Sequence, residues 1–90
     1  MSAIQQSSDT TNHKVSYMVI SADDGILWAG VTATWSNTAG NSGTATLEYP
    51  IAEVTAGYIF SVVVPATADT CSINLIYDGH IIWTSPAVST

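Results

Sequence analysis

Apolar and polar residues alternate along most of the chain after residue 13, with a period of two. Beta-branched and aromatic residues dominate the apolar positions, and turn signals recur about every ten residues. This pattern is typical of short antiparallel strands, and it lacks the 3.6-residue period of an amphipathic helix. We expect strands over residues 14–22, 26–36, 43–49, 57–65, 70–77 and 80–87.

Six short antiparallel strands do not make a stable flat sheet with one open face, so they should fold over on themselves. We therefore predict an all-β fold: a small antiparallel β-sandwich of Ig-like or jelly-roll type, with about six strands. The segment GYIFSVVV at residues 57–64, with Trp35 on another strand, resembles fibronectin-type and immunoglobulin-like modules. That resemblance is shared by sandwiches in general and identifies no family.

The first 13 residues differ from the rest of the chain. They are polar, rich in Ser, Thr and Gln, and show no periodicity. We interpret residues 1–13 as a polar N-terminal arm, which is disordered or is held by a neighbouring subunit. Residues 14–90 are interpreted as a single β-sandwich domain, because 90 residues are enough for only one core.

The segment NLIYDGHIIWT at residues 74–84 predicts a β-hairpin whose two strands are apolar on both faces. Asp78 and Gly79 suit a two-residue type I′ turn, in which Tyr77 pairs with His80.

A regular register from that turn puts Leu75 and Ile82 on the core side of the hairpin. Ile76 then lies opposite Ile81, and Asn74 opposite Trp83, on the outer side. The predicted hairpin therefore leaves a tryptophan and two isoleucines outside the core.

The strand over 26–36 shows a similar surplus of apolar side chains. Its alternation predicts the core residues Leu27, Ala29, Val31, Ala33 and Trp35. Trp28 falls on the other face, among threonines. A contiguous exposed apolar patch usually marks an interface, so we expect a homo-oligomer. The alternative is a barrel that closes within one chain and covers both sides of these strands.

Charge and cysteine content exclude several classes of partner and site. Seven acidic residues face a single Lys and no Arg, for a net charge of −6. Such a chain has nothing with which to neutralise nucleic-acid phosphates or anionic lipids. No apolar run reaches the roughly 20 residues that a membrane-spanning helix needs, so we expect no membrane insertion.

Cys71 is the only cysteine, which rules out an internal disulfide or a zinc cluster and mildly favours a reducing compartment. The N-terminus does not resemble a secretory signal peptide. We expect synthesis in the cytoplasm, and leave open whether the protein is then released or assembled on a surface.

Residues suited to catalysis are few. His13 and His80 have no nucleophile at a readable spacing, and Cys71 alternates with core residues. Asp23 and Asp24 are adjacent acids in a turn rather than a calcium loop with repeated ligands. We expect no enzymatic activity, no cofactor and no metal.

Two functions remain. The first is lectin-like glycan binding, because sugars pair an apolar face with hydroxyl groups and so favour an aromatic ring beside polar side chains. The second is a self-assembling structural subunit of a fibre, coat or tail-like assembly. The expected partners are copies of the chain itself and glycans. The ligand-binding candidates are Trp83 with Asn74, the hairpin tip with Tyr77, Asp78 and His80, and Trp28 with its neighbouring threonines.

Overall fold

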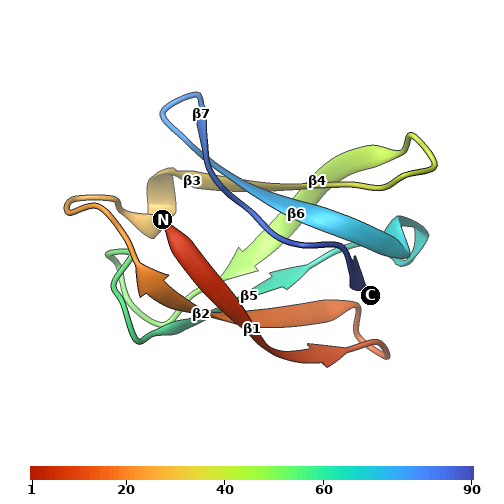
Figure 1. Ribbon diagram of the computed structural model, residues 1–90, viewed down its shortest axis with the longest axis horizontal. Coiled ribbons are helices and arrows are strands. Elements are labelled where there is room, and N and C mark those ends of the chain that lie inside the picture. The colour runs from red at the N-terminus through yellow and green to blue at the C-terminus, as the bar shows by residue number, and fades with distance from the viewer.

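The computed structural model describes all 90 residues, and the fold is all-β and antiparallel (Figure 1). Eight strands form one curled sheet, and the only helical segments are two 3₁₀ turns, η1 at Trp28–Gly30 and η2 at Ala66–Ala68. The strands are β1 (Ser2–Asp9), β2 (Lys14–Ser21), β3 (Val31–Ser36), β4 (Ser42–Glu48), β5 (Ile59–Val63), β6 (Thr70–Tyr77), β7 (His80–Thr84) and β8 (Val88–Ser89). None of the helical segments has the length and apolar character that a membrane-spanning helix needs.

The sheet curls because β4 changes partner along its length. The strand order is β1-β2-β5-β4-β3-β6-β7, with β8 paired to β6. Residues 42–45 of β4 pair with β3, whereas residues 46–48 pair with β5. In Figure 1, β4 crosses behind the molecule between the group β3, β6 and β7 and the group β1, β2 and β5. The two ends of one sheet therefore face each other across the core.

The core fills the space between these two groups of strands. It contains 17 buried apolar residues, of which 11 lie at alternate positions of β2, β3, β5 and β6 and the others in loops, in the two 3₁₀ turns and in β8. Tyr17 of β2 and Phe60 of β5 stack with their ring centroids 5.5 Å apart. Ile73 and Leu75 of β6 face them from the other group and are fully buried. Period-two alternation thus places one side of each strand inside, as the sequence predicts.

The all-β antiparallel class is confirmed, whereas the sandwich of about six strands is not: eight strands are hydrogen-bonded in one curled sheet. Two of these strands fall outside the predicted ones. β8 is only two residues long and pairs with β6 at Thr70 and Cys71. β1 lies in the segment interpreted as a polar arm, and it pairs with β2 of its own chain. The division into residues 1–13 and 14–90 as arm and domain stays a prediction.

Candidate ligand-binding surface

The β6–β7 hairpin has the predicted turn but not the predicted register throughout. Asp78 and Gly79 have φ values of 52° and 77°, as a type I′ turn requires, and Tyr77 pairs with His80. Ile76 lies opposite Ile81, also as predicted. Tyr77, Asp78 and His80 therefore lie together at the hairpin tip.

A β-bulge then changes the register and turns Trp83 inward. Leu75 pairs with Trp83 and Asn74 pairs with Thr84, so Ile82 is the extra residue of the bulge. The Trp83 ring lies edge-on to Tyr17, with centroids 4.8 Å apart, and to Phe60, at 5.8 Å. The predicted outer position of Trp83 opposite Asn74 is wrong, because one inserted residue moves every later side chain to the other face.

Trp28 is also inside the fold, for a similar reason. The 3₁₀ turn at residues 28–30 breaks the alternation, so that Trp28 is buried with a 2% exposed fraction, while Leu27 is exposed. The Trp28 ring stacks on Tyr49 with centroids 5.6 Å apart and an interplanar angle of 9°. The expected outer position of Trp28 and the expected core positions of Leu27 and Ala29 are wrong. The other predicted core residues of this strand, Val31, Ala33 and Trp35, are buried.

Polar side chains gather instead on the outer side of four adjacent strands. The register aligns them in two rows across β4, β3, β6 and β7. We call this surface the hydroxyl–amide face, and it consists of Ser42, Ser36 and Ser72 in one row and Thr44, Thr34, Asn74 and Thr84 in the other. Of the six predicted site residues, only Asn74 belongs to it.

Most of these hydroxyl groups make no hydrogen bond within the chain. The structure gives one hydrogen bond within the set, from Thr84 Oγ1 to Asn74 Oδ1 at 2.9 Å. That bond fixes the amide of Asn74 and directs its Nδ2 donor away from Thr84. The face therefore offers both donors and acceptors, at a spacing set by the strands.

A shallow cleft of about 210 Å³ adjoins one end of this face. It is lined by Ser36, Asn37, Thr38, Thr70, Cys71, Ser72 and Ala87. The side chain of Asn37 shapes its wall, because Nδ2 donates to the Ala68 carbonyl at 3.1 Å and Oδ1 accepts from the Asn41 amide at 3.0 Å. The hydroxyl groups of Ser36 and Ser72 belong both to the cleft and to the face.

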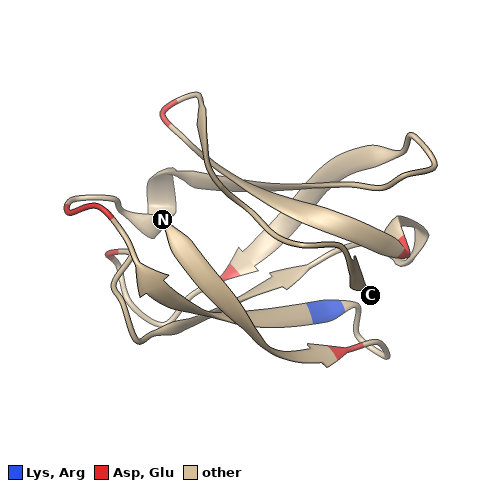
Figure 2. Cartoon of the chain, in the orientation of Figure 1, with Lys and Arg blue, Asp and Glu red and all other residues tan.

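The hydroxyl–amide face and the cleft contain no charged side chain. Figure 2 shows the acidic residues at turns and at strand ends around the molecule. An uncharged polar surface recognises ligands through hydrogen bonds rather than through ion pairs.

Groups suited to catalysis are not assembled at this surface. Burial raises the pKa of the Cys71 thiol, which keeps it protonated and weakly nucleophilic. His13 does not line the cleft, and its Nδ1 lies 2.6 Å from the Thr90 carbonyl oxygen. No three His, Cys, Asp or Glu side chains lie close enough together to hold a metal ion.

A scan against protein families, a search of curated proteins and a search of solved structures each find no match for this chain.

The sequence analysis did not predict the hydroxyl–amide face, although the sequence contains one signal for it. Ser and Thr recur at every second position over residues 32–36 and 42–46. Period two assigns them to one side of their strands, but strand order decides whether the two strands are neighbours.

Proposed function

We propose that the protein is a non-enzymatic binding module for uncharged glycans, and that the hydroxyl–amide face is its binding surface. The observation that carries the proposal is the pair of uncharged polar rows on four adjacent strands. Sugars present many hydroxyl groups that both donate and accept, so they match a surface of hydroxyl and amide groups. The seven carboxylates elsewhere on the chain would disfavour sulfated or uronic-acid glycans.

The hairpin tip extends this surface with apolar groups. Ile76 and Ile81 follow the polar rows toward Tyr77, and Ile81 is 63% exposed. The C–H faces of a sugar can pack on such side chains while its hydroxyls bind the rows. Trp28 does not supply this packing, because it is buried, and the partly buried ring of Trp83 packs edge-on against Tyr17 and Phe60.

Isothermal titration calorimetry with a panel of oligosaccharides tests the proposal. We expect uncharged hexasaccharides of glucose, mannose or xylose to include a binder, and sulfated or uronate oligosaccharides of the same length to bind more weakly. The double variant Thr34→Val/Asn74→Leu keeps side-chain volume but removes the hydrogen-bonding groups. We expect it to lose about tenfold or more in affinity, since two hydrogen bonds contribute about 1–3 kcal/mol together.

Ser61→Ala is the matched control, because it removes a hydroxyl from the opposite outer face. It should bind as the unmodified protein does. Full affinity in the double variant, or an uncharged panel that gives no heat at millimolar concentration, would refute glycan binding at this face.

A structural subunit is the second candidate, and the open edges of the sheet favour it. The strand order ends at β1 and β7, with no ladder that joins them. Unpaired backbone groups at such edges can add strands of another chain. Light scattering over a concentration series distinguishes this function, because an open polymer grows without limit while a binding module reaches a fixed mass.

A further inference from the structure

A second outer surface lies on the other end of the sheet and is aliphatic. Ile4 of β1 pairs with Met18 of β2, and Met18 pairs with Ile59 of β5. Ile20 lies two residues after Met18 on the same side of β2. We call these four residues the aliphatic face. The exposed fractions of Ile4, Ile20 and Ile59 are 53%, 49% and 48%.

These side chains are not part of the core. Their strand neighbours Val19 and Phe60 point inward and are buried, which leaves the four residues on the solvent side. They form a continuous row across three strands rather than scattered single residues. A contiguous exposed apolar patch on a protein surface marks a place where another molecule binds.

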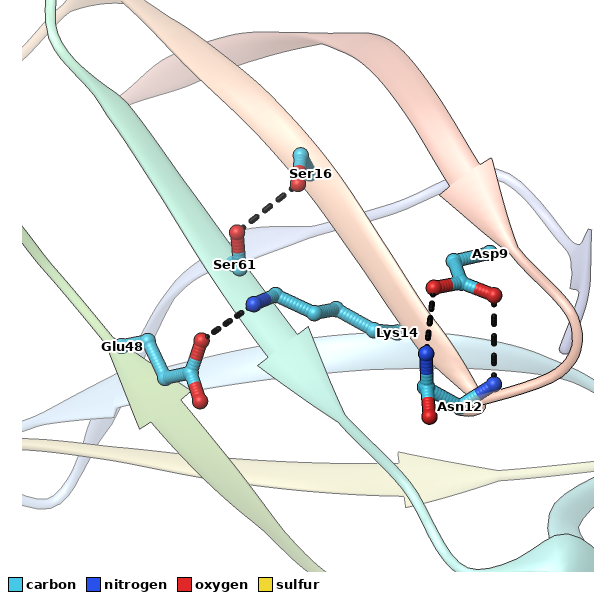
Figure 3. Close-up of polar contacts among 6 residues, drawn as sticks. All are labelled: Asp9, Asn12, Lys14, Ser16, Glu48 and Ser61. Carbon is cyan, nitrogen blue, oxygen red and sulfur yellow. Dashed lines mark hydrogen bonds and ion pairs between the residues drawn. The ribbon is translucent and has the colours of Figure 1, made fainter.

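The surface next to this patch holds an ion pair between Lys14 and Glu48, and a carboxylate, Asp9, that is hydrogen-bonded to Asn12 (Figure 3). Lys14 Nζ lies 2.6 Å from Glu48 Oε1, and Lys14 is the only basic residue other than histidine. Ser16 and Ser61 bond to each other at 2.7 Å between these charges and the aliphatic face. Asp9, at the corner, accepts 2.7 Å and 3.2 Å hydrogen bonds from Asn12.

This charge pattern identifies a second copy of the chain as the occupant. Two molecules that each carry a net charge of −6 repel one another over most of their surfaces. On this side of the sheet the Glu48 carboxylate is paired with Lys14, and only Asp9, at the corner, lacks an ion-pair partner. Two copies that meet at the aliphatic face therefore bring few free acids together. A strongly basic partner would find little to attract it here.

The size of the face sets the strength of the contact. The three strands β1, β2 and β5, at a spacing of about 4.8 Å and with up to eight residues rising about 3.3 Å each, span roughly 380 Å². A standard stable interface buries about 800 Å² per partner. The smaller area predicts a weak dimer, so a concentration series that tests it has to reach the millimolar range.

We propose that two copies of the chain associate through the aliphatic face into a symmetric dimer, each contributing the same residues. This interface does not depend on glycan binding, because the hydroxyl–amide face lies on the other strands of the sheet. The dimer would leave both glycan-binding faces accessible and so increase avidity for a repeated ligand.

Sedimentation velocity over a range from about 1 μM to 1 mM tests this proposal. The unmodified protein should shift from monomer to dimer as concentration rises. The double variant Ile4→Thr/Ile59→Thr keeps β-branched residues in the strands, and it should remain monomeric or need at least tenfold higher concentration. Near-UV circular dichroism of the variant should match the unmodified protein, which shows that the core is intact.

Ile81→Thr is the control, since Ile81 is the most exposed large hydrophobic residue but lies on the hairpin tip. It should dimerise like the unmodified protein.

Lys14→Gln provides a second variant, which leaves the Glu48 carboxylate without its basic partner. This variant should dimerise several-fold more weakly, and added salt should restore part of the lost affinity. A monomer at every concentration, or a dimer that resists Ile4→Thr/Ile59→Thr, would overturn the proposed interface.

Discussion

Tyr17 carries a phenol group that is buried in the core without a hydrogen bond of normal geometry. Ser85 is the neighbouring polar side chain, but its hydroxyl accepts from the Ile73 amide and donates to the Pro86 carbonyl. Burial raises the pKa of the Tyr17 phenol, and the nearby Ser85 hydroxyl opposes that rise. A buried polar group without a partner costs stability.

We predict that Tyr17→Phe stabilises the protein by about 0–1 kcal/mol at pH 7, measured by urea unfolding. Because the folded-state pKa of Tyr17 is raised, folding favours the protonated phenol. Below the unfolded-state pKa of about 10, the titration of Tyr17 leaves the free energy of unfolding at its full value. The free energy of unfolding then decreases as the pH rises through the folded-state pKa. The unmodified protein should therefore lose more stability than Tyr17→Phe above about pH 10.

Tyr58→Phe serves as the control for this measurement, since Tyr58 is 46% exposed. It should leave the stability at pH 7 close to that of the unmodified protein. A large loss of stability in Tyr17→Phe at pH 7 would mean that the hydroxyl has a hydrogen-bond partner in solution.

The inward or outward direction of single residues was predictable only where the alternation continues without interruption. Val31, Ala33 and Trp35 follow period two within β3 and are buried as predicted. Trp28 precedes that strand and lies in a 3₁₀ turn, where period two does not apply. No turn-forming residue at this position signals the change except Gly30, whose backbone lies against the Tyr77 ring.

At the scale of elements, the β6–β7 hairpin shows how one residue decides which side chains face outward. Its turn was predictable from Asp78-Gly79, because few residues adopt positive φ values readily. Its bulge was not, because a regular ladder and a bulged one share the same turn. Packing decides between them: the bulge at Ile82 buries Trp83 against Tyr17 and Phe60.

Deletion of Ile82 tests this account of the hairpin. Without the extra residue, a regular register would place Trp83 outside, so we predict greater quenching of tryptophan fluorescence by acrylamide. We also expect a loss of about 2–4 kcal/mol in the free energy of unfolding, because the core loses a large ring. Ile82→Ala keeps the chain length and should leave quenching unchanged. If the deletion and the substitution quench alike, the bulge does not control the position of Trp83.

Strands β1 and β8 were not predictable for a different reason. β1 has apolar residues only at Ala3 and Ile4, because it is an edge strand with little contact to the core. Its position depends on the backbone ladder with β2, and on Asp9 accepting from the Thr11 and Asn12 amides at the turn. Backbone pairing leaves no compositional pattern, so the segment is indistinguishable from a disordered arm in sequence.

At the scale of the whole molecule, curling of the sheet produces two outer faces of opposite character. Figure 1 shows the two groups of strands, β3, β6 and β7 with part of β4, and β1, β2 and β5. The register places hydroxyl and amide groups on the outer side of the first group and aliphatic ones on the outer side of the second. A surplus of apolar side chains was predictable from the sequence. Its location was not: Trp28 is buried and Trp83 partly buried, whereas the exposed large apolar residues are four isoleucines, Leu27 and two tyrosines.

Backbone amide chemical shifts in two-dimensional NMR test this division of the surface most directly. Dilution of the protein from about 1 mM should move the resonances of β1, β2 and β5, around Ile4, Met18 and Ile59. Addition of a bound uncharged hexasaccharide should move a separate set on β3, β4 and β6, around Thr34 and Asn74. Shifts on the same residues in both experiments, or no shifts in either, would contradict an account in which one outer face binds sugar and the other binds a second copy.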